Sequence, residues 1–323
     1  MSQIEPPKFS YSFFHPKYLP IWLGAGFMFL VSLLPYRFQY HLGRQLGKVM
    51  MKLMPRRVAI ARTNLELCFP EMAEQEKEKM VKDNFSSLGL GLFETAMAWF
   101  WPDWRVENNV TYKGLEHIKA LQDEGKGVLL IAIHSLNLEF GARAFGIKNP
   151  GVGVYRANKN PLYDWIQFSG RVRSNKYMLD RKDVKGMLRG LRKGDILWYA
   201  PDHDYGPRRS TFAPLFAVEK ACTTTGTSLL ANASRCALVP FTIVRNPDGQ
   251  GYTMEIEPPL DKLPRHDDTL AATQVNQAIE RSILRAPEQY MWLHRRFKTR
   301  PEGEEHSYPK KKKDKKKAKK KSI

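Results

Sequence analysis

The sequence predicts an α/β domain, in which helices flank a sheet, behind an N-terminal helix that anchors to a membrane. After Pro70, short apolar runs of strand length alternate with helical patterns, which is typical of α/β sheet domains. Ahead of them, the 19 residues from Tyr18 to Tyr36 carry no charge. Hydrophobic residues make up 42% and aromatic residues 11% of the 323, which excludes a disordered or fibrous chain.

The uncharged run fits a membrane-inserted helix. As a helix it is about 28 Å long, roughly the thickness of the bilayer hydrocarbon. Pro20 suits a first turn and Pro35 a helix end. A signal peptide fits poorly, because the preceding basic region is thin and no small-residue cleavage site follows. We expect a leader at residues 1–17 and a helix at 18–36 that spans or dips into the membrane; a buried core helix is the alternative.

Basic residues are distributed unequally around this run. Lys8 and Lys17 precede it, whereas seven basic residues follow it closely: Arg37, Arg44, Lys48, Lys52, Arg56, Arg57 and Arg62. Positively charged flanks stay on the cytoplasmic side. The larger, C-terminal part of the chain is therefore expected in the cytoplasm.

Residues 38–54 have the pattern of a basic amphipathic helix. Apolar residues recur every three or four positions from Phe38 to Leu53, and Arg44, Lys48 and Lys52 recur every fourth on another face. A helix lying on an anionic bilayer is our interpretation. The alternative is a helix packed on its own domain, with its lysines in solvent.

The alternating elements begin with a helical pattern at residues 71–101 that ends at Pro102. Gly127 to Ile133 is a continuous apolar run, typical of a buried strand. The further expected elements are helices at 138–146 and 223–234 and strands at 152–156, 195–200, 236–244 and 252–257.

The chain is strongly basic, with a net charge of +19. Residues 310–321 hold ten lysines and one aspartate, and we expect residues 309–323 to be a disordered polylysine tail. The remainder is still basic, which suits nucleic acid, anionic headgroups or an acidic carrier protein. Cys68, Cys222 and Cys236 form neither a disulfide framework nor a zinc spacing, which favours a reducing compartment.

One polar pair stands where α/β folds place reacting groups. His134 directly follows the buried strand, and Glu139 comes five positions later, where a helix begins. A carboxylate there can reach one imidazole nitrogen and leave the other free as a base. The alternative is a histidine at a strand end that is satisfied by a main-chain carbonyl.

Further polar clusters follow in order: Arg171 and Arg173 in SGRVRSNK, Asp180 and Arg181 in MLDRKD, Asp202 and Asp204 in PDHDYG, and Pro240 in LVPF. With His134 and Glu139, these resemble the four ordered blocks of the lysophospholipid acyltransferase superfamily. PDHDYG departs from the Pro-Glu-Gly of the broad superfamily and is similar to its bacterial lipid A late acyltransferase branch. The stretches NLELCFPEM, FETAMAWFWPD, GVGVYR and PEQYMWLHRRFKTRPEG also resemble that branch.

The resemblance implies an acyltransferase fold with a mixed sheet over residues 37–308. It also implies an inner-membrane enzyme, facing the cytoplasm, that transfers a lauroyl chain from acyl carrier protein to a hydroxyl of Kdo2-lipid IVA, with no cofactor. Sister enzymes that transfer a palmitoleoyl or myristoyl chain are the nearer alternative. A non-catalytic basic module that binds anionic inner-membrane lipids is the alternative from another class.

The resemblance and the chemistry together assign roles to the site residues. His134 is the expected base, Glu139 its orienting partner, and Arg171 the donor to the oxyanion. Substrate contacts are expected from Arg173, Asp180, Arg181, Asp202 and Asp204, with Arg181 clamping an acceptor phosphate. No metal is expected, because adjacent side chains in the Asp-His-Asp turn seldom converge on one ion. The basic segment 294–300 is assigned to acceptor phosphates or the membrane surface and not to nucleic acid, because no nucleic-acid fold signature accompanies it.

Overall fold

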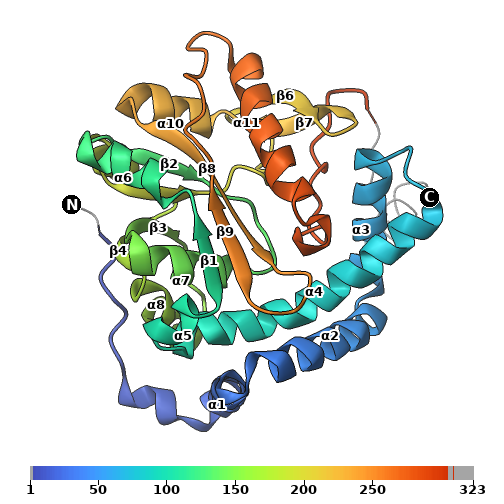
Figure 1. Ribbon diagram of the computed structural model, residues 1–323, viewed down its shortest axis with the longest axis vertical. Helices are drawn as coiled ribbons and strands as arrows, with labels where there is room; N and C mark the ends of the chain where they lie inside the picture. The colour runs from blue at the N-terminus through green and yellow to red at the C-terminus, as the bar shows by residue number, and fades with distance from the viewer. Residues whose placement is uncertain (1–2, 305–307, 309–323) are drawn as a thin grey trace, which may run out of the picture.

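A computed structural model of the chain describes residues 3–304 and 308 (Figure 1). Within these residues a seven-stranded sheet has the order β1-β9-β8-β2-β5-β3-β4, and β6 and β7 form a separate two-stranded sheet. The strands are β1 (Val110–Lys113), β2 (Val128–Ile131), β3 (Gly151–Tyr155), β4 (Asn175–Asp180), β5 (Ile196–Tyr199), β6 (Ser210–Leu215), β7 (Val218–Thr224), β8 (Ala237–Arg245) and β9 (Tyr252–Ile256).

The large sheet is mixed, as the resemblance implied. Neighbouring strands are parallel, except that β8 and β9 pair antiparallel across a short turn. Gly249 and Gly251 in that turn have φ of 68° and 77°, a region that glycine adopts without strain. On β2 the register places Ile131 opposite Tyr199 of β5 and Pro240 of β8. The carboxyl ends of β2 and β5 therefore meet at one edge, beside Pro240 of the longer strand β8.

Helices cover both faces of the sheet (Figure 1). They are α1 (Leu19–Leu33), α2 (Tyr36–Leu53), α3 (Pro55–Cys68), α4 (Glu74–Phe100), α5 (Asp103–Glu107), α6 (Leu115–Asp123), α7 (Leu138–Lys148), α8 (Pro161–Val172), α9 (Val184–Arg192), α10 (Gly226–Ser234) and α11 (Asp268–Leu284). Short 3-10 helices lie at Tyr11–Phe14, Pro16–Tyr18 and Pro287–Gln289.

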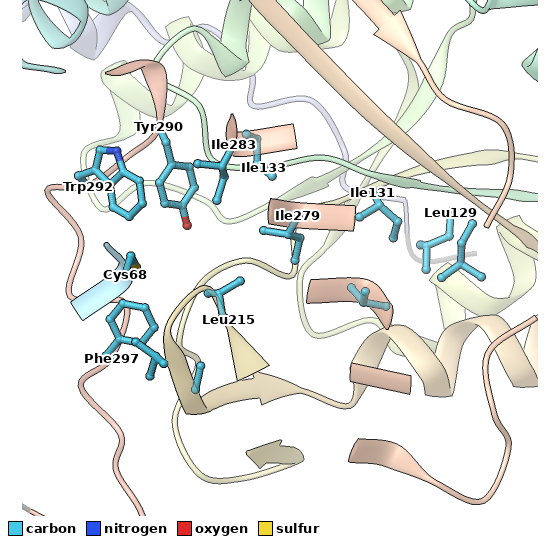
Figure 2. Close-up of a cluster of buried hydrophobic side chains, with 14 of the residues drawn as sticks. Cys68, Leu129, Ile131, Ile133, Leu215, Ile279, Ile283, Tyr290, Trp292 and Phe297 are labelled. Carbon is cyan, nitrogen blue, oxygen red and sulfur yellow. The ribbon is translucent and has the colours of Figure 1, made fainter. Parts of the chain in front are cut away.

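The alternating side chains of β2 enter two separate cores. Val128 and Leu130 pack among residues of α6, α7 and the C-terminal half of α4. Leu129 and Ile131 pack on the other face, among residues of α9, α10 and α11. Figure 2 shows this second core, in which distant segments contribute Cys68, Leu215, Ile279, Ile283, Tyr290, Trp292 and Phe297. Both faces of the strand are thus dry, which explains its continuous apolar sequence.

Helix α4 connects the sheet to the N-terminal helices. Its buried Glu94 accepts hydrogen bonds from Arg245 of β8 at 2.5 and 2.7 Å and from the Tyr252 hydroxyl of β9 at 2.7 Å. On its other side α4 packs against α2, where a Cβ atom on Gly47 would lie 2.1 Å from the Phe85 carbonyl oxygen. The two helices therefore approach at backbone contact, which only glycine permits.

The observed elements largely follow the expected ones. Helices α1 and α2 occupy the two N-terminal segments, and α4, α7, β2, β3, β5, β8 and β9 lie at the expected ranges. The helix expected at 223–234 begins only at Gly226, because β7 continues to Thr224. The polylysine tail expected at residues 309–323 lies outside the described residues. Pro16–Leu33 is long and apolar enough to be a candidate membrane span, and 17% of it is buried.

Candidate active site

His134 and Asp202 meet at the carboxyl edge of the sheet because their strands are in register. Ile131 of β2 and Tyr199 of β5 are paired in the sheet, and His134 and Asp202 lie three residues after them. The Asp202 carboxylate binds His134 twice: one oxygen lies 2.7 Å from Nδ1, and the other accepts the main-chain N–H at 3.0 Å. Asp202 is fully buried, whereas the His134 side chain is 28% exposed. A buried carboxylate thus fixes the orientation of a solvent-accessible imidazole.

The same contact decides the protonation of the ring. Burial lowers the pKa of His134, but the charge of Asp202 and its hydrogen bond outweigh burial, and the pKa lies above its usual value. Burial likewise raises the pKa of Asp202, and the His134 ring overcomes it, so this pKa lies well below its usual range. Asp202 therefore stays ionised and stabilises an imidazolium on His134.

Two more imidazoles continue the site in a stack. The His203 ring lies parallel to that of His134, with centroids 3.5 Å apart, and the His294 ring covers its other face at 4.0 Å. Burial, His134, His294 and Arg296 lower the pKa of His203 to about 3 against the opposing effect of Asp202. Burial, mainly, also lowers the pKa of His294. His203 thus stays neutral, and a positive charge in the stack forms on His134.

His134, Asp202 and His203 place potential metal-ligand atoms within 4.8 Å of one another. Their geometry suits a metal poorly. The two ring planes differ by 10° at 3.5 Å, so their in-plane lone pairs run side by side and do not converge on one point. Both Asp202 oxygens are already hydrogen-bonded to His134. We therefore derive no step through a metal ion.

Glu139 pairs with Arg171 and not with His134, the partner expected from the sequence. At the start of α7, it forms an ion pair with Arg171 of α8, whose Nε lies 3.0 and 3.1 Å from the two carboxylate oxygens and whose Nη2 also donates to it. No hydrogen bond joins Glu139 to His134 in the described part of the chain. Glu139 lies in the first turn of α7 and pairs with Arg171 of α8, whereas the strand register brings Asp202 to the imidazole.

His134, Glu139 and Arg171 nevertheless line one cavity of about 1000 Å³. Its buried wall comes from strands and from helices α9 and α10, with Ala132, Gly153, Met178, Met187 and Leu230. Exposed basic residues also line it, namely Arg181, Lys182 and Arg209. An apolar depth below a cationic rim suits an amphiphile that carries an acyl chain and a phosphate.

Three expected substrate-binding residues have partners elsewhere and do not line the cavity. Arg173 donates to the carbonyl oxygens of Trp99 and Trp101, at 2.5 and 3.1 Å, and so binds the end of α4. Asp180 closes a turn by accepting from the Lys182 main-chain N–H at 2.8 Å.

The third residue, Asp204, is buried and fastens the C-terminal segment to the 202–206 turn. Its carboxylate accepts from the Thr299 main chain at 2.7 Å, the Thr299 hydroxyl at 2.9 Å and Gly206 at 2.8 Å. Residues 294–300 also differ from expectation, because Arg296 is buried and donates to the Cys222 carbonyl oxygen at 2.8 Å. Asp204 and Arg296 thus form hydrogen bonds inside the protein. The charge pattern of the sequence does not reveal this.

Sequence patterns predict no individual role for His203 and His294, or for Lys182 and Arg209 at the cavity. His203 lies between two residues that were singled out, but its stacking depends on a segment 91 residues further along. That segment is held in place by main-chain bonds from Leu136 to Gln289 at 2.8 Å and from Met291 to His134 at 3.1 Å. No spacing in the sequence indicates these contacts.

A family model and several known proteins are similar to this chain over most of its length. The family model for bacterial lipid A biosynthesis acyltransferases matches residues 6–299. A lipid A biosynthesis lauroyltransferase of Escherichia coli (strain K12) is 57% identical over 92% of this chain and 97% of that protein. A palmitoleoyltransferase and a myristoyltransferase of lipid A biosynthesis from the same strain are 46% and 29% identical, over 93% and 94% of this chain and 98% and 95% of theirs.

Proposed function

The chain belongs to the bacterial lipid A biosynthesis acyltransferase family, and from this premise we propose that it transfers a lauroyl chain from acyl carrier protein to a hydroxyl of Kdo2-lipid IVA. The observation that carries the choice of chain is the identity gradient among the three relatives. It falls from 57% for the lauroyltransferase to 46% for the palmitoleoyltransferase and 29% for the myristoyltransferase.

His134 acts as the general base. Its Nδ1 is bound by Asp202, so Nε2 is the nitrogen that takes a proton from the acceptor hydroxyl. As that O–H bond breaks, the oxygen attacks the thioester carbonyl carbon, and the positive charge that forms on the ring faces Asp202. A positioned base of this kind contributes about 10²–10⁴-fold to the rate.

Arg171 is placed to stabilise the negative charge that develops on the thioester oxygen. Its Nε and Nη2 donate to Glu139, and its Nη1 has no hydrogen-bond partner among the described residues. Glu139 thus holds the guanidinium in one orientation while one nitrogen stays available. When the C–S bond breaks, the imidazolium of His134 returns the proton to the thiolate of the carrier. The oxygen–carbon bond replaces the sulfur–carbon bond, and no serine, cysteine or cofactor is required.

The basic rim serves the acceptor. Arg181 is exposed at the cavity and has no side-chain partner in the described part of the chain, so its guanidinium can bind a phosphate in bidentate fashion. Lys182 and Arg209 add charge beside it. The apolar wall takes the hydrocarbon of the donor, where each buried CH₂ contributes about 0.8 kcal/mol.

The proposed site of action is the cytoplasmic side of the bacterial inner membrane. The apolar helix α1 and the basic amphipathic helix α2 support membrane attachment, and the basic residues of α2 suit the anionic cytoplasmic leaflet. The net charge of +19 on this chain suits an acidic acyl carrier protein as the donor.

The test is an acyl-transfer assay with purified protein and carrier thioesters of ten, twelve, fourteen and sixteen carbons. The acceptors are lipid IVA with and without the Kdo sugars, and mass spectrometry identifies the product. We expect the twelve-carbon donor and the Kdo-bearing acceptor to give the highest kcat/KM. An optimum at sixteen carbons would assign the chain to the palmitoleoyl sister group, and no turnover with any donor would leave a non-catalytic membrane-binding module.

A further inference from the structure

Both ends of α1 are fastened to the same α/β domain. On the N-terminal side, Gln3 pairs with Leu179 of β4, and the Ile4 main-chain N–H donates to the Met178 carbonyl oxygen at 3.0 Å. Closer to the helix, buried Phe13 and Tyr18 pack with Leu162 of α8. The leader therefore runs along the domain and is anchored to an edge strand (Figure 1).

On the C-terminal side the helix end is bound by α4 and α5. The Trp101 indole N–H donates to the Ser32 carbonyl oxygen at 2.7 Å, and Arg105 donates to the same oxygen at 2.9 Å and to that of Leu34 at 2.6 Å. These bonds satisfy carbonyls at the end of α1, which have no partner within the helix. A helix that crosses a bilayer has its two flanks in different aqueous compartments, whereas both flanks of α1 contact one folded unit.

The length of α1 agrees with this arrangement. Its 15 residues rise about 22 Å, which is less than the roughly 30 Å of the hydrocarbon core. We infer that α1 does not cross the membrane and that α1 and α2 together form a surface that inserts into a single lipid leaflet. This inference rests on the membrane attachment proposed above and goes beyond it by fixing the topology.

The surface that enters the leaflet consists of exposed apolar side chains on α1 and α2, here called the membrane face. Its members on α1 recur every three or four residues, which places them on one side of the helix. They are Leu19, Leu23, Phe27, Leu30 and Leu33 on α1, between 55% and 66% exposed, and Phe38, Leu42, Val49 and Leu53 on α2, between 47% and 75% exposed.

Charge complementarity identifies the partner as an anionic bilayer. Arg37, Arg44, Lys48 and Lys52 are exposed on α2, the same helix that carries part of the membrane face, and α2 contains no acidic residue. Each such cation near an anionic leaflet contributes about 1 kcal/mol to binding. A second copy of the chain would bring the same positive charges together, which disfavours it as the occupant.

Aromatic contacts tie α1 to the end of α4 and to α8. Phe29 of α1 lies 5.5 Å from Phe100, ring centre to ring centre, and the adjacent Trp99 lies 6.4 Å from Tyr163 of α8. Tyr163 in turn lies close enough to Glu139 for that carboxylate to raise its pKa, after the larger effect of burial. These contacts run from α1 towards Glu139, which lines the cavity.

Cysteine labelling in membranes tests the topology. Lys8→Cys places a thiol before α1, and Lys119→Cys places one on the body of the domain at α6; both lysines are exposed. The native cysteines are buried and give a low background. A membrane-impermeant maleimide is applied to inverted inner-membrane vesicles and to spheroplasts.

We expect both introduced thiols to be labelled in the same preparation, to similar extents, without permeabilisation. Labelling of the two thiols in opposite preparations would show that α1 spans and would overturn the inference. A protein that stays off anionic vesicles and forms a dimer through the membrane face would overturn it too. Neither lysine lines the cavity. Acyl transfer by both variants in detergent would therefore show that the proposed activity is intact even where the labelling overturns the topology.

Discussion

The double hydrogen bond from Asp202 to the ring and main chain of His134 is the contact on which the proposed chemistry depends most. It fixes the tautomer, leaves Nε2 available and supplies the negative charge that stabilises the imidazolium. Glu139 has a separate task, because its two oxygens are used by Arg171. The two carboxylates should therefore have different kinetic signatures.

Asp202→Asn tests this division through the pH dependence of the reaction. A base must be neutral to work, so activity is lost as pH falls through the pKa of His134. Asp202 raises that pKa and burial lowers it, so removing the carboxylate moves the acid limb of kcat/KM to lower pH. We also expect kcat to fall by about 10²–10⁴-fold, because the imidazolium loses its partner.

Glu139→Gln is the matched control for the pH profile. It removes a charge from the same cavity but not from His134, so the rate should fall while the acid limb stays at the wild-type pH. An acid limb that moves in Glu139→Gln and not in Asp202→Asn would restore Glu139 as the orienting residue.

The sequence predicted which residues reach this site better than it predicted which of them contact one another. His134, Glu139, Arg171 and Arg181 all reach one cavity. The spacing of His134 and Glu139 nevertheless suggested a contact that does not form, because local spacing says nothing of which strands are neighbours. The partner of His134 lies 68 residues away, and only the β2–β5 register brings it near.

Among the elements, α2 and α4 are joined more tightly than the sequence indicated. The regular spacing of Phe38, Leu42, Leu46 and Leu53 indicated an amphipathic helix, but the side that packs on the domain is the glycine side. A Cβ atom on Gly43 would lie 2.7 Å from Cα of Leu90, and one on Gly89 would lie 2.1 Å from the Gly43 carbonyl oxygen. Hydrophobic patterns cannot reveal this interface, since glycine contributes no side chain to them.

Gly47→Ala is expected to destabilise the protein by about 1–3 kcal/mol, because the added methyl group collides with the main chain of Phe85 and must push the helices apart. Gly26→Ala on α1 is the control, since nothing lies within 4 Å of its Cβ position and alanine favours a helix by about 1 kcal/mol. Thermal unfolding in detergent measures both. Equal melting temperatures for the two variants would contradict the close packing of α2 on α4.

The cavity wall on β3 and β4 predicts how chain length is selected. A Cβ atom on Gly153 would lie 2.6 Å from Met178 Sδ, and both residues line the cavity. Gly153→Ala should displace the flexible Met178 side chain into the cavity, and the cavity should become shorter. We expect kcat/KM for the twelve-carbon donor to fall relative to the ten-carbon donor, by about 10-fold or more, given about 1–3 kcal/mol for overpacking. An unchanged ratio would remove this wall from the hydrocarbon site.

Across the whole chain, the N-terminal helices are fastened to the α/β domain that carries the cavity. The apolar α1 and basic α2 were predictable from composition and periodicity. That α1 returns to its own domain at both ends was not, because the Gln3–Leu179 pairing and the Trp101–Ser32 hydrogen bond link segments far apart in sequence. A hydropathy pattern describes a helix and not the position of its flanks.

Flotation with anionic vesicles measures the membrane face as a whole. Burying one leucine side chain contributes about 1.5–3 kcal/mol, so Leu23→Asp combined with Leu30→Asp should weaken vesicle binding by at least about 100-fold. Leu284→Asp on α11 is the control, because Leu284 is 55% exposed but lies outside the membrane face. Raising the salt concentration should weaken binding of the wild type further, since α2 contributes charge. Equal loss in both variants would mean that exposed leucines in general, and not this face, bind lipid.

The single-turnover rate of His134→Ala tests whether His134 removes the proton from the acceptor hydroxyl. The purified variant is mixed with lauroyl carrier thioester and Kdo2-lipid IVA in detergent, and its fold is verified by thermal unfolding. We predict a rate lower than that of the wild type by about 10²–10⁴-fold, with the same product in trace amounts. A folded His134→Ala protein that transfers the acyl chain at the wild-type rate would contradict the claim.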